Sequence, residues 1–397
     1  MNQQAKFNMI TDKTLVVGID IAKHTHWAQC INYRGELIAK AFPFQNNKSG
    51  FLSLLQRIKS ICQKEGFDNI VVGVEPTGHY WKCLAYALAQ EKIPLVLVNT
   101  AHVKKSSELD DNSPSKTDRK DAGVIARLIK DARFSVPNLP VGIYSDLKNL
   151  VNERDRIIKK TIRTRSQIHN ILDSYFPEFF TVLKEIDSKT AKATLRNFPL
   201  PGDILQRTDQ EILECWGKVN PYRKHEAKVQ KLKEAARQSI GLSQGVNSIK
   251  LEIKLLMEEW DFHQKQLEQI EREIKNILQQ ISYSKELLAI KGIGTISLAT
   301  ILAETGDLRN YQNWKQLRKL AGLNLVEHSS GAKKGRSHIS KKGRRKLRSI
   351  LYLVTIVMVI RNPEFRQIYH ALKERTKNPL TGKQALIALV SKLLRII

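Results

Sequence analysis

The sequence predicts an α/β domain at the N-terminus (residues 1–140), a helical coiled-coil middle (141–285) and a mainly α-helical C-terminal domain (286–397). Short β-branched runs alternate with helical patterns in the first third, which is typical of an α/β layer architecture. Apolar residues then recur at alternating spacings of four and three between Ile249 and Ile281. Beyond residue 285, apolar segments of helical length flank a strongly basic run.

The N-terminal domain begins with three short strands and continues with alternating helices and strands. We expect strands at 14–19, 26–32 and 36–41, a helix at 49–65, a strand at 69–74, a helix at 79–90, a strand at 94–98 and a helix at 115–130.

The middle combines a basic amphipathic helix with the heptad segment. The helix is expected from Asp146 to about Phe176 and carries six basic residues between positions 154 and 165, of which Arg163 and Arg165 are our candidates for nucleic-acid contact. In the heptad segment, His263 is the one polar seam residue. This pattern favours a coiled coil between two copies of the chain, and an intramolecular hairpin with the upstream basic helix is the alternative.

Two features of the C-terminal domain suggest phosphate contact. Gly292 and Gly294 form a GIG turn between two helices, which is similar to a helix-hairpin-helix, although a plain helix–turn–helix corner is the alternative. Residues 331–350 contain nine basic residues and no acidic one. The candidate phosphate ligands in this run are Lys333, Lys334, Arg336, Lys341, Arg344 and Arg345.

Charge and composition indicate a nucleic-acid partner. The chain has 397 residues and a formal net charge of +27. Residues 1–140 hold 19 basic and 13 acidic residues, and the remainder holds 47 and 26, so the C-terminal two-thirds carry +21. Such an excess attracts polyanions. The four scattered cysteines and the absence of a signal peptide or a long apolar run predict a soluble, intracellular protein without disulfides, structural zinc or a membrane partner.

Four acidic residues occupy positions that could share metal ions. Asp20 and Glu75 each follow an apolar strand, and Asp118 and Asp121 lie three residues apart at a helix start. Because strand ends of a mixed sheet meet at one edge, we expect the four carboxylates to converge there. Carboxylates gathered in this way suit two Mg²⁺ ions, which support in-line attack on a phosphodiester.

The same motifs resemble a known family. The motifs GIDIAK, VEPTGHYW and KTDRKDA are similar to those of the RuvC-type, RNase H-like domain of the DEDD transposases of the insertion-sequence 110/1111 family. The stretch from GIGTISLATILAETGDLRNYQNWKQLRKLAGL to HSSGAKKGRSHISKKGRRKLR resembles the second domain of that family. The resemblance assigns the metal-binding acids to Asp20, Glu75, Asp118 and Asp121. Pro76 departs from the usual small residue, without affecting the carboxylate.

The resemblance also implies a mechanism and partners. It makes Ser330 the nucleophile, in preference to the adjacent Ser329, and it implies a composite site in which the acids of one subunit meet the serine of another. It further implies donor and target DNA, a structured guide RNA encoded by the element, a homo-oligomer (dimer or tetramer) and a cytoplasmic, nucleoid-associated location in a bacterium or archaeon. The alternatives are a RuvC-like junction resolvase that uses water as the nucleophile, and a non-catalytic nucleic-acid-binding scaffold.

Overall fold

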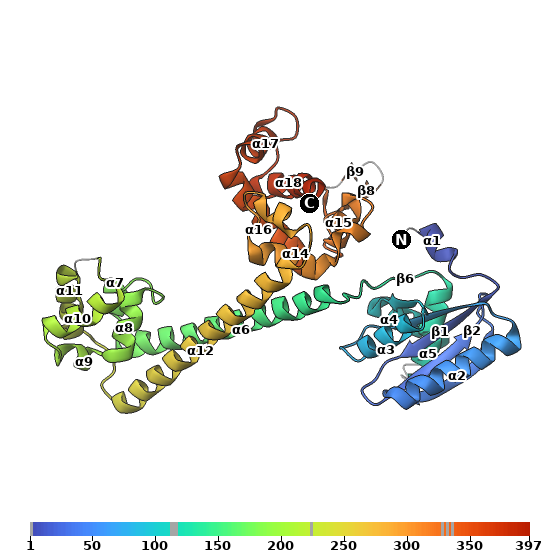
Figure 1. Ribbon diagram of the computed structural model, residues 1–397, viewed down its shortest axis with the longest axis horizontal. Coiled ribbons are helices and arrows are strands. Elements are labelled where there is room, and N and C mark those ends of the chain that lie inside the picture. Colours follow the sequence, from blue (N-terminus) through green and yellow to red (C-terminus); the bar gives the residue numbers. More distant parts are fainter. Residues whose placement is uncertain (1–2, 112–117, 223–224, 327–328, 331–332, 335–336) are drawn as a thin grey trace. The chain divides into compact units, whose positions relative to one another are not determined.

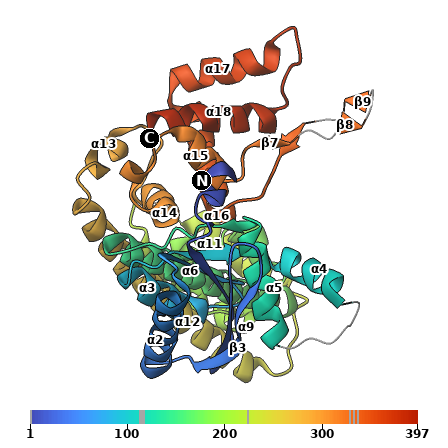
Figure 2. The ribbon, with the colours of Figure 1, turned by 90° about the vertical axis from the view of Figure 1, so that its right-hand side faces the viewer.

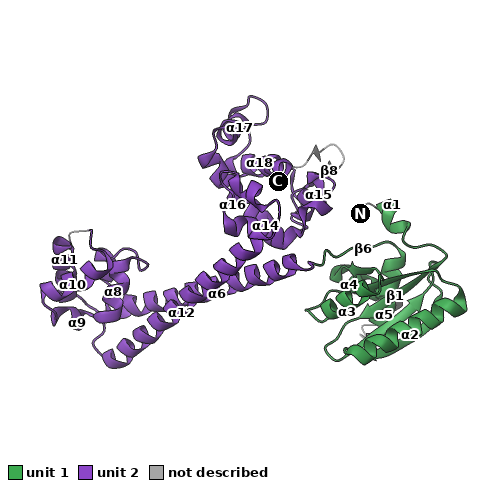
Figure 3. Cartoon of the chain, in the orientation of Figure 1, with its two compact units in different colours: residues 1–139 green, residues 140–397 purple. Residues whose placement is uncertain are grey.

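The computed structural model describes residues 3–111, 118–222, 225–326, 329–330, 333–334 and 337–397. The side chains of residues 109–111, 118, 329–330 and 333–334 lie outside this description. The chain divides into two compact units, residues 1–139 and 140–397 (Figure 3). We describe each unit by itself.

A six-stranded mixed sheet forms the centre of the N-terminal unit. Its order is β3-β2-β1-β4-β5-β6, with β4 parallel to both β1 and β5 and the other pairs antiparallel. The strands are β1 (Thr14–Asp20), β2 (Thr25–Ile31), β3 (Leu37–Gln45), β4 (Asn69–Val74), β5 (Leu95–Val98) and β6 (Phe134–Ser135). This mixed α/β sheet confirms the expected fold class of the N-terminal domain and is consistent with an RNase H-like domain.

Helices cover both faces of this sheet. They are α1 (Gln3–Phe7), α2 (Lys48–Glu65), α3 (Trp81–Gln90), α4 (Thr100–Asp111) and α5 (Asp118–Lys130). Because side chains alternate along a strand, β1 sends Leu15 and Val17 toward a core shared with α2 and α3, and Val16 toward a core shared with α5. The helices α1 and α4 and the strand β6 were not predicted from the sequence.

The C-terminal unit is built on two long antiparallel helices, α6 (Ile143–Tyr175) and α12 (Val246–Gln279), which pack along each other (Figure 1). Their ion pair between Arg154 and Glu271 has an N–O distance of 2.7 Å. Between them, α7 (Phe179–Val182), α8 (Lys189–Asn197), α9 (Pro201–Leu205), α10 (Asp209–Val219) and α11 (Glu226–Arg237) enclose a separate core around the fully buried Trp216.

The heptad seam requires a correction, because its partner is α6 of the same chain. Its residues Ile253, Trp260 and Ile274 are buried there, so the intramolecular hairpin replaces the expected seam between two copies. The physical reason is length and pattern: α6 has 33 residues against 34 in α12, and it offers a matching buried stripe. That stripe includes Val151 and Ile168.

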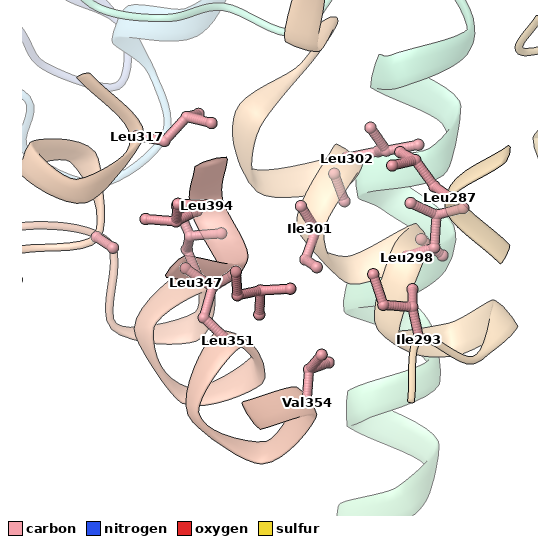
Figure 4. Packing of buried hydrophobic residues seen from close by; sticks show 14 of the residues in the cluster. Leu287, Ile293, Leu298, Ile301, Leu302, Leu317, Leu347, Leu351, Val354 and Leu394 are labelled. Carbon is pink, nitrogen blue, oxygen red and sulfur yellow. The ribbon is translucent and has the colours of Figure 1, made fainter. Parts of the chain in front are cut away.

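The remaining helices pack against one end of this hairpin around one large apolar core (Figure 4). They are α13 (Ser284–Ala289), α14 (Thr295–Thr305), the 3-10 turn η1 (Leu308–Asn310), α15 (Trp314–Leu320), α16 (Arg345–Arg361), α17 (Pro363–Glu374) and α18 (Gly382–Ile396). The sequence predicted the mainly helical character and the apolar part of α16. No helix in the described part of the chain is long and apolar enough to cross a membrane.

Candidate active site

The two strand-end carboxylates lie side by side on neighbouring strands. Ile19 of β1 pairs with Val74 of the parallel strand β4, so the next residues, Asp20 and Glu75, are neighbours at the carboxyl edge of the sheet. Adjacent strands are about 4.8 Å apart, which brings these two positions within reach of one ion. Both faces of β1 are buried, so slipping by one residue would exchange its two faces and bring a larger side chain to the place of Gly18 against α5.

The helix that carries the other two acids lies directly against β1. Gly18 is two residues before Asp20 and therefore on the same face of the strand. A Cβ at Gly18 would lie 2.2 Å from the carbonyl oxygen of Ala122 and 2.4 Å from the nitrogen of Ala126, so α5 touches the strand backbone here. This contact places the first turn of α5 beside the end of β1, with Asp121 only 5% exposed.

The donor set fits a hard divalent cation. Asp118 is the first residue of α5, one turn before Asp121, and its side chain lies outside the described residues. Carboxylate oxygens are the ligands that Mg²⁺ prefers. Among the side chains that the structure does describe, no three His, Cys, Asp or Glu residues are grouped closely enough to hold a metal ion. The described acids Asp20, Glu75 and Asp121 therefore do not form such a group by themselves.

The candidate nucleophile lies in the C-terminal unit, on a narrow β-ribbon. At its base, β7 (Leu325–Val326) pairs with β10 (His338–Ile339), and nearer the tip β8 (Ser329–Ser330) pairs with β9 (Lys333–Lys334). Figure 2 shows β8 and β9 apart from the helices of this unit. Ser330 pairs with Lys333, only three residues further along the chain. Gly331 and Arg336 lie outside the described residues.

Comparisons with known proteins match the segment that contains the four acids and the segment that contains the candidate serine. A DEDD transposase model of the IS110 type matches residues 17–177, which contain the four acids, and a model described as transposase IS116/IS110/IS902 family matches residues 284–370, which contain Ser330. The chain belongs to the IS110/IS116/IS1111 family of transposases. Members of this family are DNA-processing enzymes, and the DEDD domain implies metal-dependent catalysis.

Two relatives extend over most of this transposase, and a third matches a shorter segment. An uncharacterized 44.8 kDa protein of insertion element IS116 from Streptomyces clavuligerus is 25% identical over 95% of this chain and 92% of its own length. The transposase for IS1111A from Coxiella burnetii is 21% identical over 85% of this chain and 75% of its own length. The transposase for IS1328 from Yersinia enterocolitica is 38% identical over 86 residues, which cover 22% of this chain and 26% of that protein.

One basic residue of the transposase also has a structural contact that the sequence did not reveal. Arg344, directly before α16, donates a hydrogen bond to the backbone carbonyl of Glu304, and its guanidinium lies 3.8 Å from the Glu304 carboxylate. Lys148 of α6 binds the same carboxylate at 2.6 Å, and burial lowers the pKa of Lys148 against the opposing effect of Glu304. These contacts tie the start of α16 to α14 and α6.

The two candidates for nucleic-acid contact on α6, Arg163 and Arg165, differ in their structural contacts. Arg165 forms an ion pair with Asp187 and lies 5.6 Å from the ring centre of Trp260. Arg163, by contrast, lines a surface pocket with Lys160. Arg165 therefore holds α6 against its neighbours as well as adding positive charge.

The two glycines of the GIG turn have different surroundings. Gly292 has φ +116°, and a Cβ there would lie 2.7 Å from Cγ of Met358, so the turn itself requires glycine. A Cβ at Gly294 would meet nothing within 4 Å. Gly294 directly precedes α14 and is exposed, so of the two it is the better placed to approach a phosphate.

Sequence reasoning missed Gly18 and Glu304. Gly18 stands within the VVGID motif, and a glycine inside a strand is a known sign of close backbone approach. Glu304 ends an apolar helix, and nothing in the sequence pairs it with Lys148 or Arg344, which are 156 and 40 residues away.

Proposed function

We propose that this transposase cuts and rejoins DNA for an insertion element, using Ser330 as the nucleophile together with the carboxylates Asp20, Glu75, Asp118 and Asp121. The observation that carries the proposal is the pairing of Ile19 with Val74, which makes Asp20 and Glu75 neighbours, with the first turn of α5 held beside them at Gly18.

The four carboxylates would hold Mg²⁺. When bound, the ion supplies positive charge that offsets the negative charge of the scissile phosphate. The protein contributes the fixed spacing of the ligands, because Asp20 and Glu75 belong to paired strands and Asp121 to a helix packed on the same sheet.

Ser330 would attack the scissile phosphorus. The Oγ–P bond forms as the bond from phosphorus to the 3′-oxygen breaks, and the proton of the serine hydroxyl passes to that oxygen. The products are a 5′-phosphoserine and a free 3′-hydroxyl, which keeps the phosphodiester bond energy for rejoining. We further propose that the acids and the serine come from different copies in a dimer or tetramer.

A guide RNA would choose the DNA sites. The excess of +21 after residue 140 supports binding to a nucleic-acid backbone, and such a surface suits a protein whose sequence specificity comes from base pairing. In this scheme residues 1–140 carry the acids, 141–285 contact RNA and other subunits, and 286–397 carry the serine. Phosphate contacts are proposed for Arg163, Lys333, Lys341, Arg345 and their basic neighbours named above.

Covalent trapping tests the serine. Substrate DNA incubated with the wild-type protein and Mg²⁺ should give an adduct that survives denaturation, and peptide mapping should place the phosphate on Ser330. Ser330→Ala should lose the adduct and keep nucleic-acid binding. Ser337→Ala is the matched control, because Ser337 is an exposed serine of the same basic segment, and it should behave as wild type.

Other outcomes would identify other mechanisms. Free 5′-phosphate ends at full rate from Ser330→Ala would mean that water is the nucleophile, as in a junction resolvase. An adduct mapped to Ser329 would correct the residue and keep the chemistry. Asp20→Asn and Glu75→Gln should abolish cleavage while binding is retained, and full cleavage by either variant would refute the metal assignment.

A further inference from the structure

A groove lies next to the carboxylate edge in the N-terminal unit. It has a volume of about 610 Å³ and is lined by the ends of β5 and β6, by the start of α4, by α1 and by Pro76. Pro76 directly follows Glu75, so one wall of the groove continues from the candidate metal site. This volume lies within the range of sites that bind small organic ligands.

The pairing of the strands shows how close the groove lies to Asp20 and Glu75. Val74 pairs with Leu97 of β5, so Glu75 is level with Val98, and Val98 in turn pairs with Phe134 of β6. Asp20, Glu75, Val98 and Phe134 thus form one row across the sheet, each step being about 4.8 Å. The groove begins one strand away from Glu75.

The ionisable side chains that line the groove are all basic residues. Lys6, His102 and Arg133 line it, and none of the described lining residues is Asp or Glu. Lys6 is anchored, since its ammonium donates to the carbonyl of Phe134 and lies 5.4 Å from the centre of that ring. His102 and Arg133 are exposed. A cationic groove beside an acidic metal site is complementary to a chain of phosphates.

The floor of the groove is apolar. Val98, Ala132 and Phe134 are buried beneath it, and Leu97 is half-buried. Apolar surface next to cations suits a sugar and base joined to a phosphate better than it suits a free inorganic anion.

We propose that this groove binds the nucleotide adjacent to the scissile phosphate on the cleaved DNA strand, with Arg133 and Lys6 contacting its phosphate. The inference rests on the proposed function, because it takes the carboxylate edge as the place of cleavage. One strand of DNA has a phosphate about every 3.4 Å along the duplex axis, so one strand-to-strand step corresponds to one or two nucleotides. The groove has room for a nucleotide that is unpaired or turned out of the duplex.

Kinetics of a single variant give the first test. Arg133→Gln should raise the KM for DNA about tenfold, leave kcat within a factor of two and reduce the slope of binding against salt by about one. Lys40→Gln is the matched control, because it removes an exposed cation from β3 at the other edge of the sheet. An unchanged KM in Arg133→Gln would overturn the proposal.

Crosslinking gives a second test that needs no cleavage. DNA with 5-iodouracil at successive positions is bound to full-length Asp20→Asn protein, irradiated and mapped. Crosslinks to residues 97–102 or 132–135 should come only from the first two nucleotides beside the scissile phosphate. Crosslinks there from distant positions, or only from an RNA strand of the same sequence, would refute the groove assignment. Wild-type cleavage by Asp20→Asn would instead refute the proposed function.

Discussion

Replacing Gly18 by Ala should separate the carboxylates without removing any of them. The new Cβ would lie 2.2 Å from the carbonyl oxygen of Ala122, whereas ordinary contacts begin at 3.4 Å, so α5 must withdraw by about 1 Å. Both obstructing groups are backbone atoms and cannot rotate away. Overpacking of this kind costs about 1–3 kcal/mol, and a displacement of ~1 Å near reacting groups can reduce a rate by about 100-fold.

Two measurements on the same protein check this expectation. The thermal midpoint of the N-terminal unit should fall by roughly 3–10 °C, and Mg²⁺-dependent DNA cleavage well below that midpoint should fall by about 100-fold. Binding to RNA should change little. Gly217→Ala in α10 is the control, since its Cβ would meet nothing within 4 Å and alanine favours a helix by about 0.5–1 kcal/mol. A wild-type cleavage rate in Gly18→Ala would refute the link between this contact and the site.

Three further predictions concern the C-terminal unit. Gly292→Ala should lower the free energy of unfolding by about 1–3 kcal/mol because of its positive φ and its contact with α16, whereas Gly294→Ala should leave stability unchanged and weaken nucleic-acid binding if that turn contacts phosphate. The Arg309 side chain holds the pKa of Asp307 below its ordinary value of 3.8, so this group stabilises the fold above that value and loses its effect as the pH falls through the lower, folded pKa. Asp307→Asn should therefore show a smaller fall in thermal midpoint between about pH 5 and pH 3. Ile274→Lys, in the closed seam, should unfold the hairpin by placing an unpaired charge at a fully buried position.

Melting curves, pH series and light scattering distinguish these outcomes from their opposites. Equal melting of the two glycine variants would remove the structural explanation of the turn. An acid profile unaffected by Asp307→Asn would mean that other carboxyl groups govern unfolding there. A folded but dissociated Ile274→Lys protein would show that the seam joins copies after all.

The sequence predicted the part of the fold that depends on local pattern. Apolar runs such as Asn69–Val74 predicted strands buried between two layers. The helical spacing of apolar residues predicted α2. The short elements were not predicted, because β6 and the ribbon strands have two residues each and are too short to show a hydrophobic periodicity. The heptad pattern also predicted which face of α12 is buried. It did not predict which helix covers that face, because α6 and a second copy of α12 satisfy the same periodicity.

The features of the candidate site were likewise predictable only where they depend on local sequence pattern. Asp20 and Glu75 could be placed together because both follow parallel strands, and the register confirms that they are neighbours. The contacts of Glu304 with Lys148 and Arg344 depend on helices distant in the chain, and no local pattern contains them. The close packing at Gly18 was signalled by a glycine within a strand, although only the structure shows that α5 lies against it.

The closed hairpin also imposes an order of assembly during synthesis. Arg154 and its partner Glu271 are 117 residues apart, so at about 5–20 residues per second the apolar stripe of α6 leaves the ribosome roughly 6–23 s before its partner. The intervening helices bury Trp216 among themselves, and the amide of Leu242 donates a hydrogen bond to the carbonyl of Ser174, which brings the two ends of that insertion together. Once those ends meet, α12 is aligned beside α6 from its first turn, and the loop left to close is far shorter than the 117 residues of chain. A helical insertion that has already folded would therefore lower the entropy cost of closing the long hairpin.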